Sequence, residues 1–501
     1  MNELFLFVRP PRPLWPFNGR STAFWPPLAF ASLAAALREP LDDLRVEILD
    51  APALEMGWRT LTAEIQRRRP AFVGLGEEAV SCVEGLRLAR LAKAGGATVI
   101  AGGCFFGHVA PEALGTSVID VIVHGEGEQT LVELVEALRS GDRSDLKRVA
   151  GISFADGEEI VTTPPRPLLP DLDRLPFPAY DLLPVDRYGH RSRNHPDFAA
   201  IEASRGCVGA CDFCVLWRQM GRFVSGQVEP HLRIKSPARL LEEIRLLTRR
   251  FGRRYLGWVD PCFNAHPRVP GQLAELLLRH DLRLGQSAWV RADGVVRDAA
   301  SGALSACVRA GLNEVYLGVE RPDADSLRRL HKTTTLDETR RAFEILARDH
   351  PEVFTFGSFI YGLPGDTPAT ARAIYRLSVE LEMDKAFFIP LTPLPGTPFW
   401  RDACWDPTGE RFREFDFLPS ADRHRAHAGL DWSLFTSFAL DWCPARIRSY
   451  VRGFRCPDAR KRRMTWQILT RATRFSALGL VHRLIGNGSH SGMVFPPWYE
   501  S

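Results

Sequence analysis

Three closely spaced cysteines are the residues of this 501-residue chain whose type and spacing point most clearly to chemistry. Cys207, Cys211 and Cys214 follow an apolar run at 198–201, so we expect a strand that leads into a tight loop. Thiolates at this spacing favour an iron–sulfur cluster or a zinc ion. Three ligands leave one corner of a four-iron cluster open, and an open metal position is typical of a catalytic site.

A structural zinc site, a disulfide framework and ordinary packing are the alternatives for this triad. A structural zinc site usually takes its fourth ligand from a second Cys-x-x-Cys pair, and the chain has no second pair. A disulfide framework does not suit a long chain whose 10 cysteines are scattered. The sequence therefore favours a cluster and leaves zinc or packing open.

The motif Cys-x-x-x-Cys-x-x-Cys, with Phe213 before its last cysteine, resembles the signature of the radical S-adenosylmethionine (SAM) superfamily. The resemblance implies that the cysteines hold a [4Fe–4S] cluster, that SAM chelates its fourth iron, and that Phe213 contacts SAM. It further implies that an electron from the cluster splits SAM into methionine and a 5′-deoxyadenosyl radical, which removes hydrogen from an unreactive carbon. Such radical chemistry is supplied by cofactors and not by side chains.

Composition limits the class of protein. A hydrophobic content of 45% and a charged content of 25% are typical of a globular protein with a sizeable core, and the length suggests about three domains. A net charge of +4 is small for this length and argues against general nucleic-acid binding. The apolar N-terminus is expected to be a strand and not a signal peptide, and no charge-free run is long enough to span a bilayer. The thiols imply a reducing compartment, so we expect a cytoplasmic protein.

The first 145 residues alternate strand-like and helical segments, which predicts a parallel, doubly wound sheet that binds its ligand at the carboxyl ends of its strands. Two expected loops at such ends carry glycines, namely Gly102 with Gly103, and Gly125 with Glu126. These segments do not form the dinucleotide fingerprint. They resemble the Rossmann-like cobalamin (B12)-binding domain that precedes many radical SAM domains, which implies that these four residues contact cobalamin. A Rossmann-like turn without a ligand is the alternative.

The sequence departs from one class of cobalamin proteins in the loop after the first strand. Proteins that ligate cobalt through histidine carry Asp-x-His-x-x-Gly there, whereas this loop holds prolines and Trp15. We therefore expect no cobalt ligand from that loop. His108 is the nearby candidate, and an ordinary loop histidine is the alternative interpretation.

Residues 146–195 form the expected linker between two domains. A hairpin around Asp156 and Gly157 is predicted near its start, because Asp-Gly is a strong turn pair. The proline-rich stretch 164–180 is expected to be extended, and 171–180 resembles the linker of cobalamin-dependent radical SAM proteins.

Residues 196–400 read as about six strand–helix units, fewer than the eight of a closed barrel. An open, partial (β/α)6 barrel of the TIM type matches the radical SAM fold. The predicted fold class is therefore α/β, with a cobalamin-binding domain at 1–145, a radical SAM core at 196–400 and a C-terminal α-rich helical domain at 401–501.

Polar residues and glycines at the expected strand ends resemble the superfamily branch with Asp-x-x-Phe, Gly-x-Glu and Gly-Leu-Pro-Gly segments. The likeness implies SAM contacts from Arg291, Glu320, Gly362 and Gly365, with Lys332 as a weaker candidate. An arginine can bind a carboxylate through its fork, and an acid can bind a ribose or an ammonium group. A structural ion pair or helix cap is the alternative for each residue.

Two residues depart from the pattern of this branch. Arg321 stands where the branch commonly has a serine, and Pro261 follows Asp260. Cys262 also lies at a strand end and is a weak candidate for a catalytic hydrogen donor or acceptor. Packing is the alternative role, because free cysteines are usually buried.

The C-terminal unit contains a predicted helix at 446–473 with the basic run 460–463. A basic helix with aromatic residues can lie on an anionic membrane, so peripheral membrane contact is one interpretation of this helix. A docking helix with a solvated basic face is the preferred interpretation.

Taken over about residues 1–400, the resemblance implies a cobalamin-dependent radical SAM methyltransferase acting on an unactivated carbon of a small-molecule, lipid-like or tetrapyrrole-like substrate. An oxidative cyclase is the alternative, because the chain also resembles the branch with the anaerobic magnesium-protoporphyrin ester cyclase and the hopanoid-type methylases. A corrinoid-binding sensor is the non-enzyme alternative. A methylthiotransferase would need three more cysteines in the first domain, where only Cys82 and Cys104 occur. We expect an electron donor such as flavodoxin or ferredoxin as a partner, and no nucleic acid.

Overall fold

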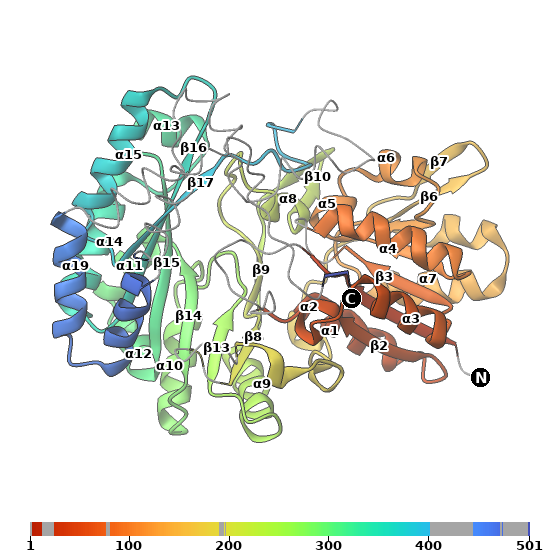
Figure 1. Ribbon diagram of the computed structural model, residues 1–501, viewed down its shortest axis with the longest axis horizontal. Coiled ribbons are helices and arrows are strands. Elements are labelled where there is room, and N and C mark those ends of the chain that lie inside the picture. The colour runs from red at the N-terminus through yellow and green to blue at the C-terminus, as the bar shows by residue number, and fades with distance from the viewer. Residues whose placement is uncertain are drawn as a thin grey trace.

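The chain forms two α/β units that lie side by side, with a short segment of strands and a helix between them (Figure 1). The computed structural model describes residues 3–12, 25–76, 81–189, 195, 197–400, 444–470, 473 and 499–500. The expectation for the loop with Trp15, and most of the expected C-terminal domain at 401–501, fall outside the described residues.

The first unit is built on a seven-stranded sheet in the order β2-β1-β3-β4-β5-β6-β7. Its strands are β1 (Leu4–Arg9), β2 (Arg45–Asp50), β3 (Phe72–Leu75), β4 (Thr98–Ala101), β5 (Val121–Val123), β6 (Ile152–Asp156) and β7 (Glu159–Thr162). Strands β1 to β5 pair in parallel, as predicted. The predicted hairpin forms β6 and β7, which pair antiparallel and extend the same sheet. The expected linker boundary at residue 145 therefore falls too early for the sheet.

Strand β1 shows why this sheet is buried on both faces. All six of its residues are buried. Leu4, Leu6 and Val8 join one apolar cluster, whereas Phe5 and Phe7 join another. Alternate side chains of a strand point to opposite faces, so a continuous apolar run fits a sheet that is covered on both sides by helices. The covering helices are α1 (Leu28–Arg38), α3 (Trp58–Arg68), α4 (Cys82–Ala94) and α7 (Glu128–Ser140).

The second unit is an open barrel of six parallel strands in the order β17-β16-β15-β14-β13-β8. Its strands are β8 (Phe198–Ile201), β13 (Tyr255–Trp258), β14 (Gly285–Val290), β15 (Leu312–Glu320), β16 (Phe354–Tyr361) and β17 (Lys385–Pro390). The edge strands β8 and β17 do not pair with each other. This confirms the predicted partial barrel. The helices that follow the strands include α9 (Pro237–Arg249), α10 (Val269–Arg279), α11 (Ala292–Ala300), α12 (Ala303–Ala310), α14 (Leu336–Asp349) and α15 (Pro368–Glu380).

The segment between β8 and α9 adds small elements that the sequence did not predict. Strand β9 (Ser204–Gly206) pairs antiparallel with β12 (Leu232–Ile234). Helix α8 (Leu216–Gln219) and the hairpin of β10 (Arg222–Val224) with β11 (Gln227–Glu229) lie between them in the chain. These elements lie between the two units (Figure 1).

The predicted C-terminal helix is interrupted. Helix α19 (Pro444–Arg455) ends before Cys456, and a second helical stretch covers 459–470. Lys461 is buried, donates to the Val353 carbonyl at 2.8 Å and pairs with Asp384 at 3.0 Å. Arg460 lies 4.7 Å over the Tyr255 ring. Part of the basic run thus packs on the barrel, which supports the docking interpretation. No helix within the described ranges is long and apolar enough to cross a membrane.

The chain between the units is anchored to the barrel by a buried hydroxyl. Tyr180 Oη donates to Glu243 Oε1 at 2.8 Å, and Glu243 pairs with Lys235 at 3.2 Å. Both Tyr180 and Glu243 are buried. A hydrogen bond to a charged group in such surroundings is stronger than a neutral one.

We predict that Tyr180→Phe lowers the free energy of unfolding by about 1.5–3 kcal/mol, because it removes a buried hydrogen bond to a carboxylate. Asp181→Asn is the matched control, because Asp181 forms an exposed ion pair with Arg38 in the same segment. That change should cost less than about 1 kcal/mol. Urea unfolding of both variants checks this, and equal midpoints would contradict it.

Candidate functional site

The three cysteines lie in the loop after β9, beyond the carboxyl end of β8. Gly206 turns the chain into this loop with φ +89°, and a Cβ there would collide with the His231 carbonyl. The Cys207 thiol accepts the Gly209 amide at 3.4 Å, and Trp217 Nε1 donates to the Cys211 carbonyl at 2.9 Å. All three thiols are free and half-buried. The loop therefore presents the predicted ligands together.

Burial makes the thiols of Cys211 and Cys214 poor nucleophiles without a metal. It raises the pKa of Cys211 to about 11, against the opposing charge of Lys332. Burial also raises the pKa of Cys214, although the backbone amides of Leu216 and Trp217 lower it. Metal binding displaces thiol protons and stabilises the thiolates. The donor set therefore fits a soft metal centre better than nucleophilic catalysis.

A [4Fe–4S] cluster takes each cysteine on a different iron, so three thiols on one loop can hold it and leave the fourth iron open. The triad supplies this donor set. A closed structural zinc site would need a fourth ligand, and the chain has no second Cys-x-x-Cys pair.

Asp260 is a residue of this site to which the sequence analysis gave no role. It follows β13, is fully buried, and accepts hydrogen bonds from the Ala203 amide at 3.1 Å and from Ser204 Oγ at 2.6 Å. It also accepts the Ser204 amide. Burial raises the pKa of Asp260 to about 6, so it is an acceptor at neutral pH. Asp260 fixes the chain that enters the cluster loop, and the signal was an acid directly after a buried strand.

Arg291 lies beside the cluster loop, as its predicted role requires. A Cβ at Gly209 would lie 3.4 Å from Arg291 Nη1. Its Nε and Nη2 bind Asp293 at 2.9 and 2.8 Å, and Nη2 also binds Thr333 at 2.9 Å. Nε and Nη2 are therefore bound by protein groups, as the ion-pair alternative predicts. Nη1 is the guanidinium nitrogen that lies nearest the cluster loop.

Glu320 and Lys332 form a pair at the end of β15. Their charged atoms are 3.7 Å apart. Glu320 has φ +65°, an unusual backbone angle for glutamate, and its carboxyl group lies against Gly318. A Cβ at Gly318 would collide with that carboxyl and lie 3.0 Å from Lys332 Nζ. Burial raises the pKa of Glu320, and Lys332 opposes this shift. Gly318 therefore makes the predicted Gly-x-Glu arrangement possible.

The turn after β16 is stabilised by hydrogen bonds and an ion pair within the protein. Asp366 Oδ2 accepts the amides of Gly362 at 2.8 Å and Leu363 at 3.0 Å. Arg321 pairs with Asp366 and donates to the Ile360 carbonyl at 2.9 Å. The amide of Gly362 is thus occupied by Asp366, which differs from the expectation that it faces SAM. Arg321, which departs from the family's serine, instead stabilises the turn that runs to Gly365.

Cys262 lies beside this region but is buried. Its thiol donates to Asn264 Oδ1 at 3.4 Å, and burial raises its pKa. These contacts support the packing role and give no support to the weak catalytic candidate.

Two glycine-containing loops and a histidine lie at the carboxyl edge of the first sheet, where the cobalamin site is expected. Gly102 and Gly103 form the turn after β4, and a Cβ at Gly125 would meet no atom within 4 Å. The buried Nε2 of His108 has no partner among the described residues. Burial, followed by the charges of His124 and Arg218, lowers the pKa of His108 to about 4, so its imidazole is neutral. These features fit a bound cofactor at this edge.

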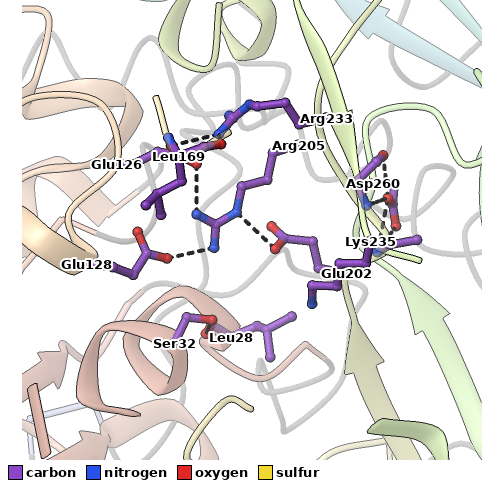
Figure 2. Close-up of polar contacts among 12 residues, drawn as sticks. Leu28, Ser32, Glu126, Glu128, Leu169, Glu202, Arg205, Arg233, Lys235 and Asp260 are labelled. Atoms are coloured by element: carbon purple, nitrogen blue, oxygen red, sulfur yellow. Dashed lines mark hydrogen bonds and ion pairs between the residues drawn. The ribbon is translucent and has the colours of Figure 1, made fainter. Parts of the chain in front are cut away.

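Glu126, which is predicted to contact cobalamin, has partners for both of its carboxylate oxygens. Its Oε1 accepts Arg205 at 2.9 Å, and its Oε2 accepts Arg233 at 2.8 Å and the Leu169 amide at 2.9 Å (Figure 2). Both oxygens are therefore engaged by protein groups from the other unit and the linker. The carboxylate of Glu126 therefore serves the junction between the two sheets, and the cobalamin contact of this residue stays a prediction.

The ligand-binding edges of the two sheets face each other. His108, from the loop after β4, lies against Gly396, from the loop after β17. In the same region the rings of Phe105 and Trp400 are 6.1 Å apart. Together with the contact of Arg205 and Glu126, these pairs join loops at the carboxyl ends of both sheets.

Two family descriptions match the two units separately. Residues 16–135 match the B12 binding domain, and residues 201–378 match the radical SAM superfamily. The chain belongs to the B12-binding radical SAM proteins. The predicted family, domain order and fold class are thereby confirmed, and with them the [4Fe–4S] cluster, SAM and cobalamin as cofactors.

Relatives of known name cover most of the chain. An uncharacterized methyltransferase of Pyrococcus horikoshii is 29% identical over 384 residues, which is 75% of this chain and 78% of the relative. The anaerobic magnesium-protoporphyrin IX monomethyl ester cyclase of Rubrivivax gelatinosus is 28% identical over 403 residues, 78% of this chain and 68% of the relative.

A solved structure shares the architecture of this B12-binding radical SAM protein. The radical SAM methyltransferase TsrM from Kitasatospora setae, with tryptophan and a SAM analogue bound, matches with a TM-score of 0.63 at 20% identity. The match covers 79% of this chain and 75% of TsrM. This similarity shows a common fold for both units.

We predict that Gly318→Ala weakens SAM binding to the cluster-loaded protein about tenfold or more, since overpacking of this kind costs about 1–3 kcal/mol. The new methyl group would displace the Glu320 carboxyl. Gly115→Ala is the control, because a Cβ there meets no atom within 4 Å. Calorimetric titration with SAM measures both variants, and equal affinities would refute the role of Gly318.

We predict that Asp260→Asn lowers the cluster content of the purified protein, because the new amide would place N–H groups against the backbone amides that Asp260 now accepts. Asp298→Asn is the matched control, since Asp298 is also buried but pairs with Arg297 on α11. Iron analysis and visible absorbance after anaerobic reconstitution measure cluster content. Full loading of the Asp260 variant would contradict this assignment.

Proposed function

We propose that this protein is a cobalamin-dependent radical SAM methylase, which transfers a methyl group to an unactivated carbon of a small molecule. One observation carries the proposal, namely that the carboxyl-end loops of the B12-binding sheet and of the radical SAM barrel contact each other. A substrate held there would lie between the two cofactor sites. The similarity to the methyltransferases of P. horikoshii and K. setae supports the same function.

When bound, the cluster with SAM supplies a carbon-centred radical, and cobalamin supplies the methyl group. The protein's own residues hold and orient these groups. Cys207, Cys211 and Cys214 would hold the cluster, while Asp260 fixes the strand end that leads into their loop. Glu320 with Lys332 would orient SAM. Burial of this region keeps water away, which a reactive radical requires.

Ring closure of a porphyrin ester is the second candidate. The similarity to the cyclase of R. gelatinosus, over 78% of this chain, favours it. Both reactions would use the same cluster site, so the described residues that hold SAM do not separate them. A corrinoid sensor without activity would have no use for a triad with an open iron.

Further parts of the proposal concern partners and place. A reductant must supply the electron, and we propose a flavodoxin or ferredoxin. We place the enzyme in the cytoplasm, where thiols stay reduced. We also propose peripheral membrane contact through the C-terminal helices, since Arg462 donates to the Cys456 and Pro457 carbonyls of the C-terminal segment and not to the barrel.

Anaerobic reconstitution with iron and sulfide, followed by SAM, dithionite and hydroxocobalamin, tests the proposed function. We expect 5′-deoxyadenosine release and corrin absorbance that stays with the protein. Cys211→Ala is the control, and it should abolish release because the cluster loses a ligand. Absence of 5′-deoxyadenosine from a protein with an intact cluster would refute the enzyme function. In extracts supplied with methyl-labelled SAM, label in the product indicates methyl transfer, whereas unlabelled product indicates ring closure.

A further inference from the structure

One arginine beside the cluster loop is bound by three carboxylates. Arg205 lies two residues before Cys207 and is 7% exposed. Its Nε donates to Glu202 at 3.0 Å, Nη1 to Glu126 at 2.9 Å and Nη2 to Glu128 at 2.6 Å. Figure 2 shows these carboxylates arranged around a single guanidinium. Each of the three guanidinium nitrogens of Arg205 therefore donates to a different carboxylate.

The carboxylates come from both units of the protein. Glu126 and Glu128 follow β5 at the carboxyl edge of the B12-binding sheet, and Glu128 begins α7. Glu202 follows β8 of the barrel. Arg205 therefore connects the edge of one sheet to the first strand of the other.

A second arginine, Arg233, binds one of these carboxylates. Arg233 on β12 pairs in register with Arg205 on β9, and its Nη1 donates to Glu126 Oε2 and to the Leu169 carbonyl, both at 2.8 Å. We call Glu126, Glu128, Glu202, Arg205 and Arg233 the junction cluster. Its side chains are at most 17% exposed.

The chemistry of the junction cluster favours a fixed geometry. A guanidinium is planar and its N–H directions are rigid, so three simultaneous partners define its position and orientation. Burial opposes the charge of Arg205, but the carboxylates Glu202 and Glu128 outweigh it and raise its pKa, so it remains a cation. Buried ion pairs contribute little net stability compared with apolar packing, and specifying an arrangement is a better-supported use of them.

We propose that Arg205 is a positioning residue that fixes the cluster loop against the B12-binding sheet and thereby sets the separation of the two cofactors. Two residues span at most about 7 Å, so a displaced Arg205 would carry Cys207 with it. This inference rests on the proposed function, since it requires both cofactors. A misplacement of about 1 Å in such a site can cost about 100-fold in rate, which gives the constraint a purpose.

The test is a distance measurement on two variants, each of which changes one side of the junction cluster. Arg205→Lys keeps the charge but loses the three-way fork, and Glu126→Gln removes a charge from the other side of the junction. Each protein is loaded with hydroxocobalamin and iron–sulfur cluster, then reduced to paramagnetic cob(II)alamin and reduced cluster. Pulsed dipolar EPR then gives the distribution of cobalt–cluster distances.

We expect a narrow distribution in the wild type and a broader or shifted one in both variants. The double variant should show no more broadening than the single ones, because the two residues act through one contact. Glu133→Gln is the matched control. Glu133 lies on the same helix α7 and pairs with Arg166, which lies outside the barrel, so its distribution should equal that of the wild type.

The outcomes separate this inference from the proposed function. A wild-type protein that retains no corrin or releases no 5′-deoxyadenosine would refute both the proposed function and the positioning role of Arg205. A loaded wild type whose distribution is unchanged in Glu126→Gln would overturn the positioning role alone. If Arg205→Lys fails to hold the cluster, Glu126→Gln decides, because Glu126 belongs to the B12-binding unit and lies far from the cysteines in the chain. Lower thermal stability with an unchanged distance would indicate a purely structural ion pair, and would likewise overturn the proposal.

Discussion

Parallel strand pairing is the constraint on which the rest of this structure depends. Parallel neighbours need a crossover connection, so every strand of such a sheet ends at the same edge, and the loops that follow the strands gather there. This protein contains two such sheets, with β1 to β5 in one and all six strands in the other. The contact of His108 with Gly396 shows that the gathered edges meet. The loops at these edges therefore bring together residues from distant parts of the chain.

The polar groups at this meeting place are held by other polar groups, not by apolar packing. Asp260 accepts amides from the strand before the cluster loop, Asp366 accepts amides of the turn after β16, and Arg321 neutralises Asp366. Each buried charge has a directed partner, as low-dielectric surroundings demand. Loops built in this way keep one shape even though they lack regular hydrogen bonding.

The sequence was sufficient to predict what depends on local pattern. Strand–helix alternation predicted both sheets, and cysteine spacing predicted the metal ligands, because periodicity and ligand spacing are written along the chain. The roles of Glu126 and Arg321 were not predictable, because their partners lie 79 and 45 residues away. The hairpin of β6 and β7 was predicted as a hairpin, but its place in the first sheet depends on pairing with β5. Ion pairs and strand pairings between residues far apart in the chain could therefore not be predicted from the sequence.

Arg205 also has a consequence for the order in which the protein matures. The chain leaves the ribosome from its N-terminus, and domains generally fold as they emerge. The carboxylates of Glu126 and Glu128 belong to the part made first, whereas Cys207 and its neighbours follow. The cluster loop thus emerges beside a partner surface that has already folded. We therefore expect the B12-binding unit to be assembled before the metal centre.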